Sequence, residues 1–429
     1  MKGHERRLTF SPYDHKLTTK NVFTPDGRRV AYDTRTKGGP LSRIETVDIG
    51  TLEIRIIFES GSGAQGCVVT CHPFLNKFVF IKGLDNPGVN GAYCAHCRQG
   101  AIVDEAYPNI AENLDARDIY PPFTPGAMRG GSHVHVWHPD GSMISNTYED
   151  AMLADNGLLH DTPECDANLR NIEVNLLGHP VKVKNAPGNH GGSSYSFLAA
   201  RLVSDPAPGS NDISAAIEEG WIGINGYIRP DGTRQKKALA FQGVTVDAAC
   251  RQVREVYITD LPEEIPTDAP ETAGTATRRP LPPKGVSQRR VTRLCERRYP
   301  GIFGPRHWLK STPDGSKIVF YAMDDAGIVQ AYFVSPGGGA ITAITNNPFS
   351  ITSDFTISPD GLAIFYFAGG SLHRTEIGGE TTRLTENSDI PVNRPVVVSP
   401  DGGRVVYARD LPHGETGEIF SQLCLFEFD

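Results

Sequence analysis

The stretch from Ser358 to Phe367 reads SPDGLAIFYF, a tight turn followed by an apolar run of strand-forming residues. In a Pro-Asp-Gly turn the proline presets φ, the aspartate side chain hydrogen-bonds to nearby backbone, and the glycine adopts a positive φ. Residues such as Ile, Phe and Tyr after the turn favour a pleated strand. We align four further copies of this tripeptide with it, which start at Pro25, Pro139, Pro313 and Pro400.

The spacing of these turns indicates a repeat. The last three follow one another at intervals of about 40 to 50 residues, and each unit reads as strand, turn, strand, loop, strand, which is typical of the blades of a β-propeller. Counting such units predicts seven, although six or eight blades stay open. The units begin near Asn21, Gly66, His133, Tyr195, His307, Asp354 and Arg394.

Both ends of the chain complete the ring in this interpretation. The segment from Arg7 to Phe10 resembles the outer strands that precede later turns, but no blade comes before it. The tail from Phe420 to Phe428 supplies strands that have no outer partner. Pairing the two would remove exposed strand edges. The sequence therefore predicts an all-β fold, a seven-bladed β-propeller closed by pairing of the N- and C-terminal strands.

We expect residues 1–429 to form a single β-propeller domain with two loop insertions. The first lies near 204–236, where prolines precede a short helical pattern from Ile213 to Gly220. The second lies near 262–288, is rich in Pro, Thr and Glu, and predicts a long surface loop.

Charge and hydropathy exclude several classes of protein. The 429 residues carry a formal net charge of −8, which gives no electrostatic support for binding nucleic acid. No run of 18 apolar residues is present, so we expect no membrane span. The N-terminal residues are not an apolar export segment, which predicts a cytoplasmic protein unless a leader has been removed.

The eight cysteines are scattered and do not predict a disulfide scaffold. Cys94-Ala95-His96-Cys97 has the one spacing suited to a metal, but a structural zinc site needs a second pair, and none follows at finger or ribbon spacing. We therefore expect a polar loop with free thiols.

Polar residues cluster just before the predicted inner strands, where the loop that enters each strand opens at one rim of the central channel. His133 and His135 alternate along a strand, so we expect them on one face, where they suit a metal or acid–base catalysis. The structural alternative is a pair that hydrogen-bonds neighbouring blades. Gly130 and Gly131 would let the backbone approach the axis closely.

The remaining rim residues also allow two interpretations. Arg129 and Arg306 could each hold a carboxylate through the guanidinium fork, or could form salt bridges between blades. Tyr195 could donate a proton or be an ordinary phenol at the edge of the core. The other rim candidates are His190, His307, Asp354 and Arg394, of which Asp354 and Arg394 could instead pair across the pore.

Long motifs identify a family. The segment from Pro121 to Val136 reads PPFTPGAMRGGSHVHV, Glu218 to Trp221 reads EEGW, and Pro305 to Trp308 reads PRHW. With these motifs the chain resembles the TolB-like propellers and, more closely, the bacterial YidR-type proteins, over nearly its whole length. That family has no settled activity to carry over.

A more distant likeness implies chemistry. His135 to Ser142, HVWHPDGS, looks like a segment of the oligogalacturonate lyases, which are seven-bladed propellers. Those enzymes bind a manganese-type ion through histidines and a glutamine and cleave uronate chains by β-elimination. The likeness covers about one blade, and their Gln-x-x-His-x-His metal cluster is missing from this sequence. The resemblance implies a lyase acting on an acidic oligosaccharide or glycoside at the central mouth, with a divalent ion, Mn or Ca, as a possible cofactor.

β-Elimination needs a neutralised carboxylate, a base and an acid. In this hypothesis Arg129 and Arg306 bind the substrate carboxylate, His133 or His135 is the base, and Tyr195 or His307 is the acid. His190, Asp354 and Arg394 complete the substrate-binding set. Two alternatives stay open: a glycoside hydrolase on the same scaffold, which needs two carboxyl groups, and a propeller that binds a sugar or a partner protein without turnover.

Overall fold

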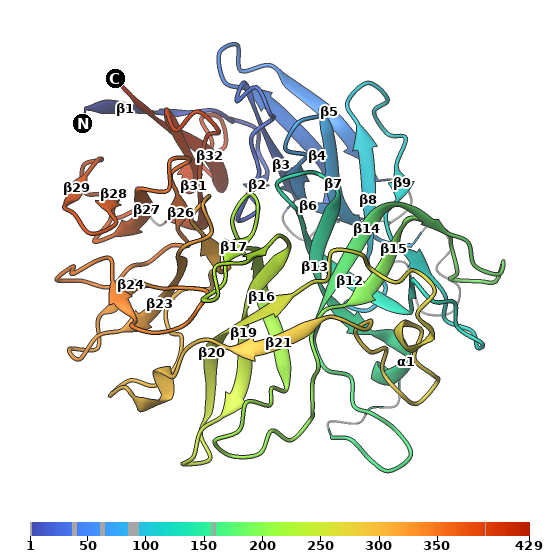
Figure 1. Cartoon of the computed structure of the whole chain (residues 1–429). Coiled ribbons are helices and arrows are strands. Elements are labelled where there is room, and N and C mark those ends of the chain that lie inside the picture. The colour runs from blue at the N-terminus through green and yellow to red at the C-terminus, as the bar shows by residue number, and fades with distance from the viewer. Residues whose placement is uncertain are drawn as a thin grey trace.

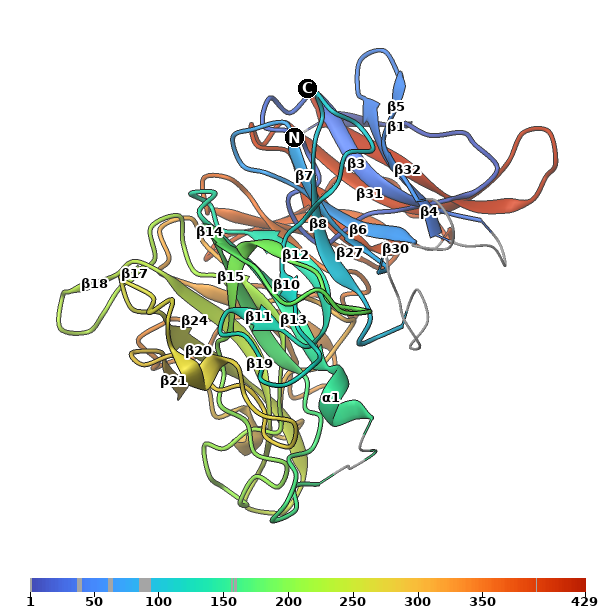
Figure 2. The same cartoon turned by 90° about the vertical axis from the view of Figure 1, so that its right-hand side faces the viewer.

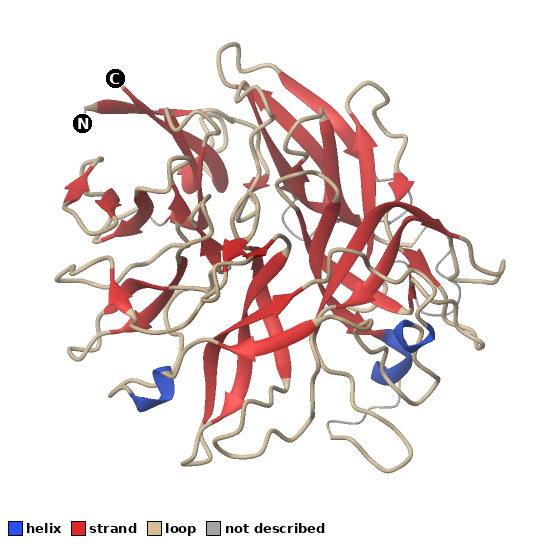
Figure 3. Cartoon of the chain, in the orientation of Figure 1, coloured by secondary structure: helices blue, strands red, loops and turns tan. Residues whose placement is uncertain are grey.

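Seven four-stranded antiparallel sheets surround one axis in this protein (Figures 1 and 3). The structure is a computed structural model that describes residues 2–36, 41–60, 65–84, 94–155, 157, 160–390 and 392–429. Its helical elements within these residues are α1 (Ala151–Ala154) and two single-turn 3₁₀ segments, Pro270–Thr272 and Leu294–Glu296. The predicted seven-bladed β-propeller is confirmed. No helix within the described residues is long and apolar enough to cross a membrane.

The blades follow one another along the chain, and each runs from an inner strand at the axis to an outer strand. Blade one contains β2 (Asp14–Lys16), β3 (Arg29–Arg35), β4 (Leu41–Asp48) and β5 (Ile54–Glu59). Blade two contains β6 (Gly66–Cys71), β7 (Lys77–Lys82), β8 (Gln99–Asp104) and β9 (Glu112–Asn113). Blade three contains β12 (Gly130–Trp137), β13 (Met143–Asp150), β14 (Asn171–Val181) and β15 (Gly192–Leu198).

Blades four to six have the same order. Blade four contains β16 (Ala215–Trp221), β19 (Ala238–Val246), β20 (Gln252–Asp260) and β21 (Ser287–Arg290). Blade five contains β22 (Lys310–Ser311), β23 (Ile318–Met323), β24 (Val329–Val334) and β25 (Thr342–Ala343). Blade six contains β26 (Thr356–Ile357), β27 (Ala363–Ala368), β28 (Ser371–Glu376) and β29 (Thr381–Arg383). Two short pairs lie outside the blades, β10 (Ala116–Arg117) with β11 (Ala127–Met128), and β17 (Tyr227–Ile228) with β18 (Arg234–Gln235).

The seventh blade joins the two ends of the chain. It contains β30 (Val392–Val398), β31 (Arg404–Pro412), β32 (Ile419–Phe428) and, as its outer strand, β1 (Gly3–Arg7). β1 pairs antiparallel with β32 over five residues, and both chain ends lie side by side (Figures 1 and 2). The predicted closure is confirmed, although the N-terminal strand begins before the expected Arg7.

In blades one, three, five, six and seven a Pro-Asp-Gly turn connects the inner strand to the second strand of the blade. Gly27, Gly141, Gly315, Gly361 and Gly402 all have φ between 69° and 75°. In each turn the aspartate carboxylate accepts a hydrogen bond from the amide two residues later, as at Asp360 and Leu362 (2.9 Å). All five turns therefore lie at the same end of the propeller, which we call the turn side.

The fourth blade differs from the prediction. Tyr195 lies in β15, the outer strand of blade three, and blade four begins at β16. The short helix expected from Ile213 to Gly220 is wrong, because this segment is the inner strand itself. A further Pro-Asp-Gly at Pro230 lies in the β17–β18 hairpin inserted after that strand, and this insertion hides the repeat.

Hydrophobic cores fill the spaces between neighbouring blades. Phe365 and Phe367 of β27 pack with Tyr407 of β31 and Phe426 of β32, which joins blade six to blade seven. Val30 and Tyr32 of β3 belong to the cluster that joins blade seven to blade one. Because each blade buries both faces, every blade depends on the closure of the ring.

The closure makes a testable prediction. Glu5 of β1 accepts a hydrogen bond from the Tyr407 hydroxyl and forms an ion pair with Arg409 (3.3 Å), whose side chain is only 5% exposed. Glu5→Ala leaves that arginine unpaired, and we expect a loss of about 2 kcal/mol in the free energy of unfolding by urea titration. Glu415→Ala, at an exposed loop position, is the control. Equal stability of the two variants would contradict this account of the closure.

Candidate functional site

Four inner strands contain an irregularity in their pairing with the second strand of the blade: β6, β12, β16 and β30. In three of them a residue other than glycine has a positive φ: Val68 (60°), Val134 (62°) and Glu218 (50°). This conformation is uncommon for such residues, and β-bulges of this kind re-aim the neighbouring side chains. The bulges therefore decide where the polar residues of the inner strands point.

The bulge in β12 separates His133 from His135. His135 is fully buried against blade two, where a Cβ placed on Gly100 would lie 2.6 Å from its Nε2 atom. His133 lies opposite Thr147 of β13, whose hydroxyl donates to Glu219 of blade four (3.3 Å). The extra residue at Val134 breaks the strict alternation on which the expectation of one shared face rests, so that expectation stays a prediction.

The glycine pair before His133 serves a close approach, but to a neighbouring loop. A Cβ on Gly131 would lie 2.4 Å from the carbonyl oxygen of Ala95. The amide of Ser132 donates to the carbonyl of Arg98 (3.1 Å). The start of β12 is therefore held against the loop that enters β8.

Glu219 is a buried acid at this rim with a raised pKa. Its side chain lies in the β16 bulge and is 1% exposed. One carboxyl oxygen accepts from Thr147, and the other has no hydrogen-bond partner among the described residues. Burial, together with the negative charge of Glu218, raises the pKa of Glu219 to about 7. At neutral pH this carboxyl can therefore both accept and release a proton.

Glu218 and Arg306 form an ion pair next to Glu219. Arg306 Nε donates to Glu218 Oε1 (2.6 Å), and the guanidinium lies over the Trp308 ring, 4.5 Å from its centroid. The Arg306 side chain is 40% exposed, whereas that of Glu218 is 6% exposed. Within the described residues the guanidinium hydrogen-bonds through Nε alone, so its two terminal NH₂ groups remain available for an anion.

His133 completes this group. Its ring is half-buried, and burial, with the charges of Arg98 and Arg306, lowers its pKa to about 3. The imidazole is therefore neutral at pH 7 and is suited to hydrogen bonding rather than to charge. We call His133, Thr147, Glu218, Glu219 and Arg306 the rim cluster; it lies where chain segments enter the inner strands, opposite the turn side.

His307 follows Arg306 but is not part of the rim cluster. Its Nδ1 donates to the carbonyl of Pro305 (2.8 Å), and its Nε2 accepts from the amide of Tyr321 (3.1 Å). Both ring nitrogens are thus engaged, and burial lowers the pKa of His307 to about 3. This geometry gives His307 a structural role and no proton to deliver.

Arg129 and Tyr195 hold the 262–288 segment against blade three. Arg129 Nε donates to Asp150 (2.8 Å), and its terminal nitrogens donate to the carbonyls of Thr275 and Arg278. The Tyr195 hydroxyl hydrogen-bonds to Thr272 (2.9 Å). Both side chains are buried, and none of these partners belongs to the rim cluster defined above.

Of the other three rim candidates, His190 and Asp354 have partners outside the rim cluster, and the third is not described in its side chain. His190 pairs through its backbone with Arg117, and its Nδ1 lies 3.2 Å from the carbonyl oxygen of Gly191. Asp354 binds Lys310 through both carboxylate oxygens (2.8 Å each) and accepts from the Thr19 hydroxyl. Arg394 belongs to β30, but its side chain lies outside the described residues.

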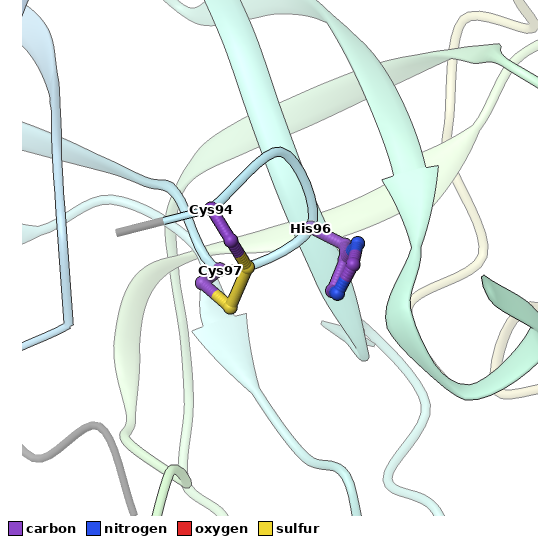
Figure 4. A group of neighbouring side chains, drawn as sticks. All are labelled: Cys94, His96 and Cys97. Carbon is purple, nitrogen blue, oxygen red and sulfur yellow. A yellow bond between two sulfur atoms is a disulfide. The ribbon is translucent and has the colours of Figure 1, made fainter. Parts of the chain in front are cut away.

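The cysteine motif forms a disulfide between Cys94 and Cys97 (Figure 4). The prediction of free thiols is wrong for this pair. The two intervening residues form a tight turn that brings the sulfur atoms together, and the amide of Cys97 donates to the carbonyl of Cys94 (3.0 Å). His96 projects from the same loop beside them (Figure 4).

The residues present do not fit the divalent ion that the resemblance implies. Among the described residues, His, Cys and carboxylate atoms gather within ligand distance of one another only at Cys94, His96 and Cys97. The two sulfurs there are joined to each other, and Mn²⁺ or Ca²⁺ prefers oxygen ligands. No step below is therefore routed through a metal.

Sequence reasoning missed Glu218 and Glu219 as functional candidates, because their segment looked helical and they entered only as part of a family motif. Lys20, Lys310 and Thr19 near the axis were also missed. The one available signal was the pair of adjacent acids in a segment that is otherwise apolar, Ile217 to Ile222.

The fold and the bulged inner strands define a seven-bladed propeller with a polar rim on one side. The family described as "Protein of unknown function (DUF3748)" matches residues 65–190. The chain is 38% identical over 409 residues to the uncharacterized protein YidR of Escherichia coli (strain K12). These residues cover 92% of this chain and 93% of that protein. It therefore belongs to the YidR family, as its motifs predicted.

Solved structures support the fold. An oligogalacturonate lyase in complex with manganese matches with a TM-score of 0.56 and 13% identity, over 100% of this chain and 98% of that chain. The β-propeller domain of the Trilobed protease from Pyrococcus furiosus matches with a TM-score of 0.50 and 10% identity, over 98% of this chain and 95% of that chain. At these identities the likeness concerns the architecture alone.

The pKa of Glu219 predicts a pH dependence of stability. The ordinary glutamate pKa is 4.5, so between pH 4.5 and 7 the folded protein keeps a proton that the unfolded chain releases. The stabilising contribution of this bound proton is full below pH 4.5 and is lost as the pH rises through 7. In total the free energy of unfolding falls by about 3 kcal/mol. Glu219→Gln carries no such charge, so urea unfolding at pH 5 and pH 8 should show the wild type losing about 3 kcal/mol relative to this variant. Parallel pH profiles would contradict a raised pKa.

Proposed function

We propose that the rim cluster cleaves an acidic oligosaccharide or glycoside by β-elimination, with Glu219 as the proton-transfer group. The observation that carries this proposal is a buried carboxyl, with a pKa near 7, beside an arginine whose terminal NH₂ groups are available. The architectural likeness to an oligogalacturonate lyase supports the same reaction class.

Each step of the elimination has a candidate group. The terminal nitrogens of Arg306 bind the uronate carboxylate, which makes the proton on the adjacent carbon more acidic. Ionised Glu219 removes that proton, the carbon–oxygen bond to the leaving sugar breaks, and a double bond forms in the uronate ring. The protonated Glu219 then donates its proton to the departing oxygen. One carboxyl with a pKa near 7 can perform both transfers.

The neighbouring residues position these groups. Thr147 holds one oxygen of Glu219, and Glu218 holds Arg306 through Nε. In this proposal the neutral His133 ring hydrogen-bonds a sugar hydroxyl. Compared with the hypothesis drawn from sequence, the base moves from His133 or His135 to Glu219, and Tyr195 and His307 are left out because their hydroxyl and ring nitrogens are engaged elsewhere.

A glycoside hydrolase is the second candidate, because Glu218 and Glu219 provide two carboxyl groups in one bulge. Hydrolysis needs two carboxyls on either side of the scissile bond. The products distinguish the two reactions, because elimination leaves an unsaturated uronate that absorbs in the ultraviolet and hydrolysis does not.

The test is a screen of acidic oligosaccharides for that absorbance, followed by variants on the best substrate. We expect Glu219→Gln to lower kcat by about 10²- to 10⁴-fold, because it removes the proton-transfer group. Arg306→Gln should raise KM and lower kcat, since the carboxylate loses its counter-charge. The control is Glu264→Gln, at an exposed position in the 262–288 segment. Full activity of Glu219→Gln would refute the assignment.

A further inference from the structure

A second site lies at the opposite end of the axis. Two adjoining cavities of about 300 Å³ and 180 Å³ open at the turn side. Residues from all seven blades line them, so together they form the central mouth of the propeller at this end. Both cavities share Lys20, Pro139, Thr356, Ile357 and Pro359. Their combined size is at the lower end of the range for small-molecule sites.

Lys20 carries an uncompensated charge in this mouth. No hydrogen bond or ion pair joins its ammonium group to another described residue. Burial, together with the charge of Lys310, lowers the pKa of Lys20 to about 8. A lysine that is desolvated and unpaired is costly, and an anion that entered the mouth would relieve that cost.

The other charges near the axis are already paired. Lys310 Nζ binds both carboxylate oxygens of Asp354, and it also donates to the Thr19 hydroxyl (3.0 Å). The same hydroxyl donates to Asp354, and the ammonium lies over the Phe355 ring, 4.6 Å from its centroid. This bridge joins blades one, five and six across the axis. Of the two lysines among the described residues that line the mouth, it leaves Lys20 without a counter-charge.

The walls of the mouth are apolar. Prolines of five blades line the larger cavity, Pro25, Pro73, Pro139, Pro359 and Pro400, together with Phe23 and Trp137. A sugar ring would leave most of its hydroxyl groups without partners against such walls, and this costs free energy. A ligand with a compact anionic head and an apolar body matches both features.

We propose that the turn-side mouth binds a small amphipathic monocarboxylate, with its carboxylate on Lys20 and its apolar body against the prolines and Trp137. This site is separate from the rim cluster and does not depend on the proposed lyase reaction.

The test uses octanoate as the probe and the full-length protein. We expect isothermal titration calorimetry to detect octanoate binding to the wild type and at least tenfold weaker binding to Lys20→Met. Lys236→Met, at a 62% exposed lysine, is the matched control and should bind as the wild type does. Thermal unfolding should show Lys20→Met to be at least as stable as the wild type, because it removes an unpaired charge.

A second comparison needs no variant. Octanamide has the same apolar chain without the charge, and we expect it to bind the wild type at least tenfold more weakly than octanoate. Equal binding of octanoate and octanamide, equal binding by Lys20→Met, or no binding of octanoate to the wild type would each overturn the proposal.

Discussion

The pairing of β1 with β32 is the constraint on which the rest of this structure depends. Each blade buries its faces against two neighbours, so an open ring would expose one face of blade one and one face of blade seven. The closing strand is held by five backbone-paired residues and by Glu5, which reaches Tyr407 and Arg409. Once the ring is closed, the inner strands of all seven blades must meet around one axis.

Meeting at an axis concentrates polar side chains in a space with little water, where their pKa values shift. The structure handles this in different ways along the axis. In the middle, Lys310, Asp354 and Thr19 compensate one another. At the rim, Glu219 remains an acid with a pKa near 7 beside the Glu218–Arg306 pair, and at the turn side Lys20 remains without a counter-charge. The proposed lyase site and the proposed carboxylate site are two places, among the residues that the structure describes, where this compensation is incomplete.

The fold could be predicted from sequence because its main signal is local. The turns at Pro139 and Pro359 depend on the chemistry of three adjacent residues, and the structure repeats it with the same hydrogen bond and the same glycine φ. The predicted start of blade four was wrong because the β17–β18 hairpin separates the inner strand of this blade from its second strand, so no local turn marks where the blade begins.

The candidate site could be predicted only in part. Arg306 and His133 were found because they lie just before or early in a predicted inner strand, whereas Glu219 was not, because its orientation depends on a bulge. A positive φ at Glu218 or Val134 is unfavourable for the isolated residue and is imposed by packing between blades, which leaves no pattern in the sequence.

The central claim is that ring closure leaves Glu219 as a buried carboxyl ready to exchange a proton near neutral pH. The most direct measurement is a pH titration of ¹³C-glutamate-labelled protein by carboxyl NMR, with the Glu219 signal assigned as the one that Glu219→Gln lacks. The account predicts a midpoint at about pH 7. A midpoint below about pH 5, in the ordinary range of glutamate, would contradict it.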